Sequence, residues 1–191
     1  AAALLNDAGY SVCLLEPRLD RSRPQGEIGL RTYALTPAVR RILEAARAWA
    51  PLDHSRVGRF DAMQVWDAGS SGHLDFMPPP GHHGAMGYIL EQQNLVAALA
   101  ESLATRPGVS LQAHALTGFE AGVPVVLALD DGSRLRTRLL IGADGNASPV
   151  RVAAGIATDG YDYGQHALIA RVEVTRPQPH TAFEHFTREG P

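Results

Sequence analysis

The segment from residue 134 to residue 151 constrains the fold and the chemistry of this chain more than any other. Its first half is an apolar strand that runs into Gly142-Ala143-Asp144-Gly145, and Ser148 and Arg151 then enter a short helix. Glycines let backbone amides approach a phosphate, an aspartate accepts from ribose or backbone donors, and a helix N-terminus adds positive potential for an anion. A bare Asp-Gly pair is more typical of a plain turn, as we expect at Asp131-Gly132. The longer string therefore predicts a loop that binds a phosphate-bearing ligand.

The first 16 residues have the pattern of the second half of a βαβ unit. Residues 1–8 are typical of the last turns of a helix, Gly9 closes it, and the apolar run from Tyr10 to Glu16 ends in an acid. In dinucleotide-binding folds such an acid hydrogen-bonds a ribose hydroxyl, and the glycine fingerprint lies about 20 residues before it. Counting back from Glu16 runs off the start of the chain, so we expect a piece that lacks G-x-G-x-x-G. The alternative for Glu16 is a solvated carboxylate at the end of a strand.

The remaining pattern mixes βα pieces with antiparallel β-rich pieces, which favours an α/β fold of two interleaved subdomains. A Thr36-Pro37 cap and apolar periodicity predict a helix to about residue 49, and Gly and Ser residues predict a β-hairpin within 60–77. Further helices are expected at 88–104 and 149–154, and further strands within 109–129, at 134–141, at 165–175 and at 181–187.

Composition excludes several classes of protein. The net charge of −3 gives no electrostatic case for binding nucleic acid. The single cysteine, Cys13, cannot form an internal disulfide, and its apolar neighbours predict a buried side chain. No apolar run approaches the roughly 20 residues that span a bilayer. With no pair of cysteines and no H-x-x-x-H beside an acid, we expect no metal site, and no G-x-S-x-G elbow indicates a hydrolase.

The strand–loop–helix around Asp144-Gly145 resembles the DG motif of class A flavoprotein monooxygenases. Other segments narrow the resemblance to the hydroxylases of ubiquinone biosynthesis, and it then covers nearly the whole chain in order. These segments are Leu14-Leu15-Glu16-Pro17, Met63-Gln64-Val65-Trp66-Asp67 with Gly72-His73-Leu74-Asp75-Phe76, Asp162-Tyr163-Gly164-Gln165, and Ala182 to Pro191.

The resemblance implies FAD as the cofactor, with NAD(P)H as the co-substrate. It implies a partial Rossmann-like FAD-binding domain at 1–59 and 86–158, interleaved with a partial antiparallel β-rich substrate domain at 60–85 and 159–191. No catalytic residue can be named. The resemblance implies six residues at the cofactor, which are Glu16, Arg31, Gln92, Asp144, Gly145 and Arg151.

Two of these six residues match family positions along the FAD. Arg31 matches the arginine that lies along the diphosphate and the ribityl chain, a role that suits the paired donors of a guanidinium. Gln92 matches an amide residue that contacts the same region. The alternatives are a surface arginine and a glutamine on the surface of a helix. Five aromatic residues could line a substrate pocket, although core packing is expected for most of them: Trp66, Phe76, Tyr161, Phe183 and Phe186.

The implied reaction is the hydroxylation of an aromatic ring, with a polyprenylated phenol of ubiquinone biosynthesis as the expected substrate. NAD(P)H would reduce the flavin, and the reduced flavin would use O₂ to transfer one oxygen atom to the ring. The expected location is cytoplasmic, with peripheral attachment to the inner face of the bacterial membrane or to a biosynthetic complex as a further option. Two alternatives remain open, a non-catalytic relic or binding module and another FAD oxidoreductase such as a reductase or a halogenase.

The family's C-terminal third, with its Gly-Asp segment at the flavin ring, would lie downstream of residue 191. We therefore expect the 191-residue piece to bind FAD weakly or not at all and to be inactive, while the full-length parent is an FAD-dependent monooxygenase. Titration of the piece with FAD tests this expectation, and binding tighter than micromolar would contradict it.

Overall fold

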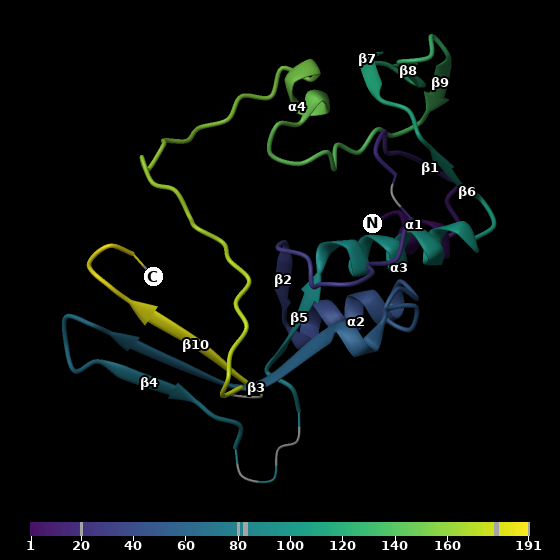
Figure 1. Ribbon diagram of the computed structural model, residues 1–191. Coiled ribbons are helices and arrows are strands. Elements are labelled where there is room, and N and C mark those ends of the chain that lie inside the picture. Colours follow the sequence, from purple (N-terminus) through teal and green to yellow (C-terminus); the bar gives the residue numbers. More distant parts are fainter. Residues whose placement is uncertain (20, 80, 82–83, 178–179, 191) are drawn as a thin grey trace. The chain divides into compact units, whose positions relative to one another are not determined.

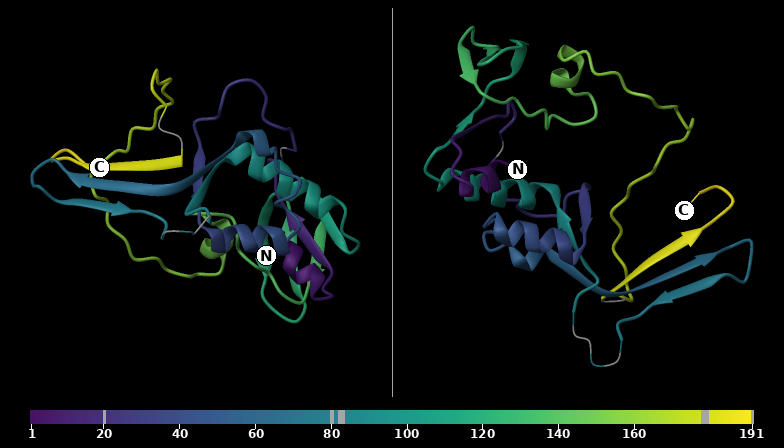
Figure 2. Two further views of the ribbon diagram at one scale, coloured as in Figure 1. Left: turned by 90° about the horizontal axis from the view of Figure 1, so that it is seen from below. Right: turned by 180° about the vertical axis from the view of Figure 1, so that it is seen from behind.

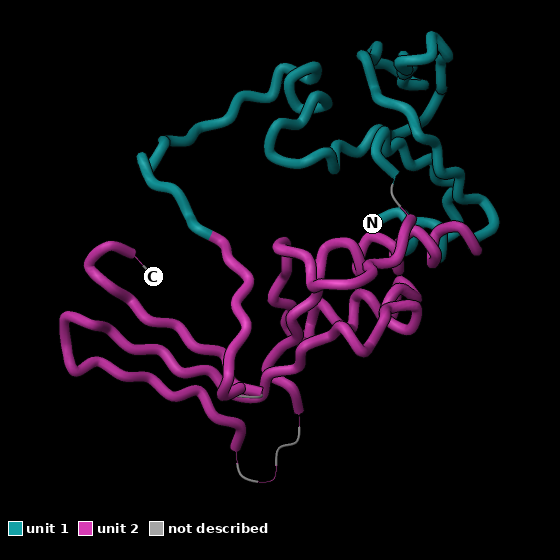
Figure 3. The backbone as a smooth tube through the Cα atoms, viewed as in Figure 1, with its two compact units in different colours: residues 1–19, 106–168 teal, residues 20–105, 169–191 magenta. Residues whose placement is uncertain are grey.

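The computed structural model describes every residue of the chain except 20, 80, 82–83, 178–179 and 191. The chain forms two compact units, and each contains two separate stretches of sequence (Figure 3). Unit 1 comprises residues 1–19 and 106–168, and unit 2 comprises residues 20–105 and 169–191. The predicted α/β class is confirmed, since both units combine helices with sheets. The units do not follow the expected domain boundaries, and the division into FAD-binding and substrate domains stays a prediction.

Unit 1 begins with the helix–glycine–strand pattern expected from the sequence. Gly9 follows the first helix with a φ of +87°, a left-handed conformation that glycine adopts without strain. The first strand then pairs in parallel with a later strand, with Val12 opposite Val109, as a βαβ unit requires. The elements of unit 1 are α1 (Ala2–Asp7), β1 (Val12–Leu15), β6 (Val109–Gln112), β7 (Leu116–Glu120), β8 (Val125–Leu129), β9 (Arg134–Thr137) and α4 (Pro149–Ala153).

Two predictions in unit 1 are wrong. Cys13 is exposed, because β1 pairs with β6 alone among the described strands and so is an edge strand of a two-stranded sheet. The strand expected at 134–141 stops at Thr137, whose hydroxyl donates to the carbonyl of Leu139 at 3.0 Å and closes a local turn. The Asp131-Gly132 turn is confirmed, with Gly132 at a φ of +81° between the antiparallel strands β8 and β9.

A strand expected at 165–175 is also absent from the described structure. These residues are exposed and irregular, and Leu168 is 95% exposed. The apolar alternation of this segment fits a strand, but a strand also requires a partner, and none of the described strands pairs with it.

Unit 2 is built on a five-stranded sheet with the order β10-β3-β5-β2, and β4 pairs with the other end of β3. β4, β3 and β10 lie side by side in a ribbon (Figures 1 and 2), in which β10 runs parallel to β3. The hairpin expected within 60–77 is thereby confirmed. The elements of unit 2 are β2 (Thr32–Leu35), α2 (Pro37–Ala45), the short 3-10 helix η1 (His54–Arg56), β3 (Val57–Asp67), β4 (His73–Phe76), β5 (Gly87–Glu91), α3 (Gln92–Ala104) and β10 (His180–Phe186).

The helix α3 shares a core with β5 in unit 2 and is bonded to the end of α2. Thr36 caps α2 as expected, and its hydroxyl accepts from the backbone N–H of Val39. The hydroxyl of Ser102 on α3 donates to the carbonyl of Ala46 at 2.6 Å and ties the helices together. The core contains Leu52, Tyr88, Leu90 and Ala98.

The helix predicted at 88–104 begins only at Gln92, and residues 87–91 form the strand β5 instead. β5 has a partner on each side, since β2 and β3 both pair with it, and its Leu90 side chain is completely buried. Gly87 allows the close approach of Phe60, whose ring would lie 2.4 Å from a β-carbon at that position. Pairing on both sides thus outweighs the helical tendency of the segment.

The expected core packing of the aromatic residues is wrong for four of the five. Tyr161, Phe76, Phe183 and Phe186 are exposed, and Trp66 is half-buried and stacks on His185 with the ring centroids 4.9 Å apart. None of the described helices is both long and apolar enough to cross a membrane.

Candidate functional site

The structure brings Arg31 and Gln92 together in unit 2, although 60 residues separate them in the sequence. Arg31 directly precedes β2, and its carbonyl accepts from the backbone N–H of Gln92 at 2.9 Å, at the point where β5 passes into α3. The hydroxyl of Tyr33 donates to the side-chain carbonyl of Gln92 at 3.0 Å, and the Arg31 guanidinium lies 6.0 Å from the Tyr33 ring centroid. Gln92 is therefore part of an ordered junction and is only half-exposed.

The side chain of Arg31 is available to an anion. Arg31 is exposed, and no described residue accepts a hydrogen bond from its guanidinium. A guanidinium with its paired donors turned to solvent suits a diphosphate or a carboxylate. The assignment of Arg31 and Gln92 to a cofactor stays a prediction.

A buried ion pair stands beside this junction, and the sequence analysis missed it. Glu91, the last residue of β5, accepts from Arg56 through both carboxylate oxygens, at 2.7 Å from Nε and 2.9 Å from an Nη atom. Arg56 holds the pKa of the Glu91 carboxyl below its ordinary value, and the N–H of Gly29 acts in the same direction. The signal in the sequence was the acid that ends the apolar run Tyr88-Ile89-Leu90, at a place where charge needs a partner.

Asn94 fixes the turn that carries Arg56. The Asn94 side chain is completely buried, accepts from the N–H of Asp53 and donates to the carbonyl of Asp53, each at 2.9 Å. Asp53 in turn caps η1, since its carboxylate accepts from the N–H of Ser55. Arg56 is the last residue of that short helix, so Asn94 sets its position from the first turn of α3.

In unit 1 the predicted loop residues hold one another. The Asp144 carboxylate accepts from the hydroxyl of Ser148 and from the N–H of Val150, the latter at 3.0 Å. Ser148 caps α4 by accepting from the N–H of Arg151. The Ser148 hydroxyl, and after it the Val150 N–H, hold the pKa of Asp144 below its ordinary value. Asp144 thus shapes the loop and the start of α4.

Asp144, Gly145 and Arg151 line one cavity of about 540 Å³ in unit 1. Gly145 has a φ of +86°, and the guanidinium of Arg151 donates to the carbonyl of Asn146 at 2.6 Å, so a side chain of α4 closes the turn that follows Gly145. Most of the other lining residues are apolar, and Phe119 is one of them. The structure therefore brings these three predicted residues together, and the identity of what they bind stays a prediction.

Glu16 is not among the residues that line this cavity. It lies directly after β1, is exposed, and its carboxylate accepts from the N–H of Arg18 at 3.0 Å. This bond closes a turn at the end of the strand. The proposed contact between Glu16 and a ribose stays a prediction.

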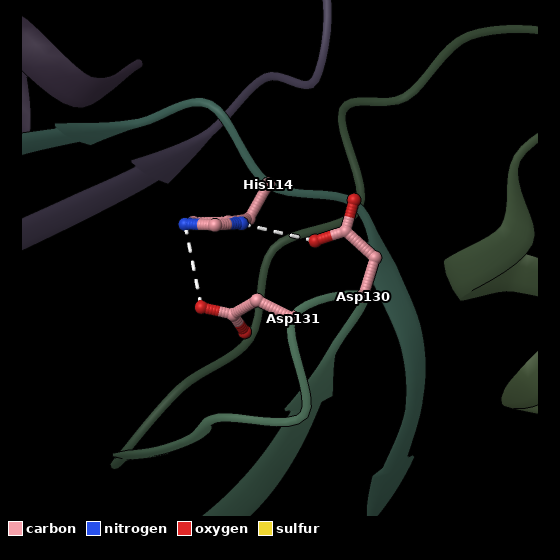
Figure 4. A group of neighbouring side chains, drawn as sticks. All are labelled: His114, Asp130 and Asp131. Carbon is pink, nitrogen blue, oxygen red and sulfur yellow. Dashed lines mark hydrogen bonds and ion pairs between the residues drawn. The ribbon is translucent and has the colours of Figure 1, made fainter.

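One group of side chains in unit 1 could hold a metal ion, although none was expected. The ligand atoms of His114, Asp130 and Asp131 lie within 4.8 Å of one another (Figure 4). Both ring nitrogens of His114 face a carboxylate, Nδ1 at 3.0 Å from Asp130 and Nε2 at 3.5 Å from Asp131. One ion can use only one ring nitrogen, so the arrangement as it stands is that of a histidine bridging two exposed carboxylates. The expectation of no metal stays a prediction.

The sequence matches a family model described as FAD binding domain over residues 1–189. Ubiquinone hydroxylase UbiL of Rhodospirillum rubrum is 32% identical, over all of this chain and 44% of its own length. Ubiquinone biosynthesis monooxygenase COQ6 of Danio rerio is 33% identical, over 97% of this chain and 41% of its own length. The chain thus spans less than half the length of these curated relatives, and the predicted resemblance to the ubiquinone-biosynthesis hydroxylases is confirmed.

Solved structures support the fold. PqsL of Pseudomonas aeruginosa, solved with 2-aminobenzoylacetate, is similar with a TM-score of 0.64 and 23% identity, over 85% of this chain and 44% of that one. The p-nitrophenol 4-monooxygenase PnpA of Pseudomonas putida has a TM-score of 0.64 and 20% identity, over 84% of this chain and 41% of that one. With the family model matching nearly every residue, the chain belongs to the FAD binding domain family of flavin-dependent enzymes.

Proposed function

We propose that the full-length protein hydroxylates an aromatic ring, using FAD, NAD(P)H and O₂, and that its substrate is a polyprenylated phenol of ubiquinone biosynthesis. The observation that carries the proposal is the junction in unit 2, where the backbone N–H of Gln92 donates to the carbonyl of Arg31 and Tyr33 contacts both side chains. The names of two relatives, a ubiquinone hydroxylase and a ubiquinone biosynthesis monooxygenase, support the choice of pathway.

The residues of this junction fit an extended, doubly anionic cofactor such as FAD. The Arg31 guanidinium would pair with the diphosphate, and the Gln92 amide would face the chain that links it to the flavin. FAD supplies the redox and oxygen chemistry when it is bound, and the protein binds it, orients it and excludes water. In unit 1 the Asp144 carboxylate would keep α4 and the Gly145 turn in place, since its hydrogen bonds are already made within the loop.

The aromatic substrate and O₂ are the proposed partners, and polyprenyl substrates reside in membranes. We therefore propose a cytoplasmic protein that works at the inner face of the bacterial membrane or in a biosynthetic complex. Sedimentation of the full-length protein with lipid vesicles tests the first option. Protein that stays in the supernatant with all vesicle compositions would contradict attachment to lipid.

The experiment that tests the reaction measures oxygen insertion. The full-length protein, saturated with FAD, is supplied with NADH or NADPH, ¹⁸O₂ and a short-chain prenylated phenol, and the product is analysed by mass spectrometry. We expect one ¹⁸O atom in the ring product. Oxidation of NAD(P)H without incorporated oxygen for every phenol would support a reductase, and absence of both FAD binding and turnover would support a non-catalytic binding module.

Arg31→Gln gives a residue-level test of the same proposal. We expect FAD to bind about tenfold more weakly, because one charge-assisted contact is lost. Arg41→Gln is the matched control, since Arg41 is an exposed arginine on α2 outside the junction. Equal FAD affinity of the two variants would contradict the role of Arg31.

A further inference from the structure

The ion pair between Glu91 and Arg56 has no part in the proposed reaction. Its removal from water needs a physical explanation, because burying charges is costly. The Glu91 side chain is 4% exposed and that of Arg56 is 15% exposed. Burying two charges costs nearly as much as their attraction returns, and apolar residues of similar volume often stabilise a fold equally well. A pair kept in such a place is expected to fix a particular arrangement of the chain.

The arrangement that it fixes is the loop before Arg31. Arg56 donates to the carbonyls of Gly26 and Glu27 at 3.0 and 3.1 Å, while Glu91 accepts from the N–H of Gly29 at 2.7 Å. The pair thus contacts three backbone groups of residues 26–29, and Gly29 is only two residues from Arg31. We call this ion pair and its three backbone bonds the Glu91–Arg56 clamp.

The same loop is tied down again directly after the clamp. The backbone N–H of Gln92, the neighbour of Glu91, donates to the carbonyl of Arg31. Two adjacent residues at the β5–α3 junction therefore hold the chain on both sides of residue 30. Glu91 binds Gly29 through its side chain, and Gln92 binds Arg31 through its backbone N–H. Arg31 has little freedom left except in its own side chain.

The charge of the clamp also matters for an anionic ligand. A free carboxylate at Glu91 would stand one residue from Gln92 and would repel a diphosphate at this junction. Arg56 neutralises that carboxylate and uses its remaining donors on backbone carbonyls. Arg171 also contacts this loop, but it pairs with the carboxylate of Glu27 and donates to the carbonyl of Ile28, so Arg31 is the exposed guanidinium of this loop for which no described carboxylate is a partner. Of the arginines that contact this loop, Arg56 and Arg171 are paired with carboxylates, which leaves the guanidinium of Arg31 for an anionic ligand.

We propose that the Glu91–Arg56 clamp is a positioning device that presents the guanidinium of Arg31 to the diphosphate of FAD. This inference rests on the proposed function, because it takes Arg31 as a contact of FAD. The clamp itself touches no cofactor and acts through the loop 26–31.

A double-mutant cycle on FAD affinity tests the clamp. The full-length protein is stripped of FAD, and the dissociation constant is measured by the quenching of flavin fluorescence for wild type, Glu91→Gln, Arg31→Gln and the double variant. We expect each single substitution to weaken binding about tenfold, and the double variant to bind no more weakly than Arg31→Gln alone. If Glu91→Gln weakened FAD binding without acting through Arg31, the two factors by which the dissociation constant rises would instead multiply in the double variant.

The controls separate folding from positioning. Glu44→Gln removes an exposed carboxylate that pairs with Arg40 on α2, and we expect its FAD affinity to equal that of wild type. If Glu91→Gln does not fold, Arg56→Lys takes its place in the cycle, since lysine keeps the charge beside Glu91 and cannot reach both loop carbonyls. Far-UV circular dichroism of each FAD-free variant identifies those that fold.

The outcomes are distinct. Fully multiplicative effects of Glu91→Gln and Arg31→Gln overturn the positioning role and leave the proposed function intact. A wild-type protein without FAD affinity, or an Arg31→Gln variant that binds FAD normally, overturns the proposed function itself.

Discussion

Arg31 in unit 2 is held by residues far away in the sequence, whereas the Asp144 loop in unit 1 is held by its close neighbours. Glu91 contacts Gly29 and Arg56 across 62 and 35 positions. Asp144 contacts Ser148 across only four. The first arrangement exists only when the sheet and helices of unit 2 have assembled, and the second can form as soon as α4 forms. Substitution of Glu91 should therefore lower the stability of the whole of unit 2. Substitution of Asp144 should affect only one turn of unit 1.

The largest effect is expected for Glu91→Gln. The substitution leaves the partly buried Arg56 without its counter-charge, and we expect a loss of about 3 kcal/mol in the free energy of unfolding at neutral pH. Urea unfolding of the FAD-free full-length protein, followed by tryptophan fluorescence, measures it. Glu44→Gln, which affects an exposed pair between neighbouring turns of α2, should cost no more than about 0.5 kcal/mol. Equal losses in the two variants would remove the contrast between a buried and an exposed pair.

The pH dependence of the same variant has a definite sign. Arg56 lowers the pKa of Glu91 in the folded state, so the ionised carboxylate stabilises the fold above the ordinary value near 4.5. This contribution is lost as the pH falls below 4.5 through the lowered pKa of the folded state. The difference in stability between wild type and Glu91→Gln should therefore be full at pH 7 and shrink steadily below about pH 4.5. A difference that grows on acidification would contradict the ion pair.

Asn94→Ala should have the second-largest effect and should also reach the clamp. It removes two partly buried hydrogen bonds to the backbone of Asp53 and leaves a small cavity at the completely buried Asn94 position, at a total cost of about 2 kcal/mol. Gln93→Ala, one position earlier on the exposed side of α3, is the matched control and should cost less than about 0.5 kcal/mol. The same urea titration measures both, and a larger loss for Gln93→Ala would contradict the anchoring role of Asn94.

The sequence predicts those parts of the fold that depend on local chemistry. The Thr36 cap, the Gly9 and Gly132 turns and the short helix after Ser148 are each determined by one to four residues, and each is confirmed. The strand β5 was expected as helix, because the pattern of Tyr88-Ile89-Leu90 does not reveal that β2 and β3 pair with it on both sides.

The candidate site divides along the same line. Asp144, Gly145 and Arg151 were predicted together because they are neighbours in the sequence. The Glu91–Arg56 clamp was missed because its members come from two different elements, the strand β5 and the 3-10 helix η1. No local pattern marks an arginine in a 3-10 turn as the partner of an acid at the end of a strand. Burial and pairing of that kind are properties of the assembled sheet.

Asp144→Ala tests the local side of the comparison. Without the carboxylate, the first turn of α4 loses acceptors for the Ser148 hydroxyl and the Val150 N–H, so amide exchange at 150–154 should become about fivefold faster. The urea midpoint of unit 2, followed by Trp49 and Trp66, should stay unchanged. Since the pKa of Asp144 is lowered, the wild-type loop should lose this protection as the pH falls below its ordinary value near 3.8. Asp159→Ala, an exposed aspartate outside the loop, is the control, and a shift of the urea midpoint in Asp144→Ala would contradict a purely local role.

The smallest effect is expected at His114, where one imidazole contacts two carboxylates but all three side chains are exposed. Exposed ion pairs are screened by water and salt, and two of them on one side chain still stabilise little. We expect His114→Ala to change the thermal midpoint by less than about 2 °C at pH 6, with no further change in 1 M NaCl. Adding Zn²⁺ distinguishes a metal site from a surface ion pair at this cluster. A concentration of roughly 0.1 mM is chosen because a weak exposed site fills in that range. A rise in the wild-type midpoint that His114→Ala abolishes would make the cluster a metal site, while equal midpoints leave it a surface ion pair, the weakest of the contacts compared above.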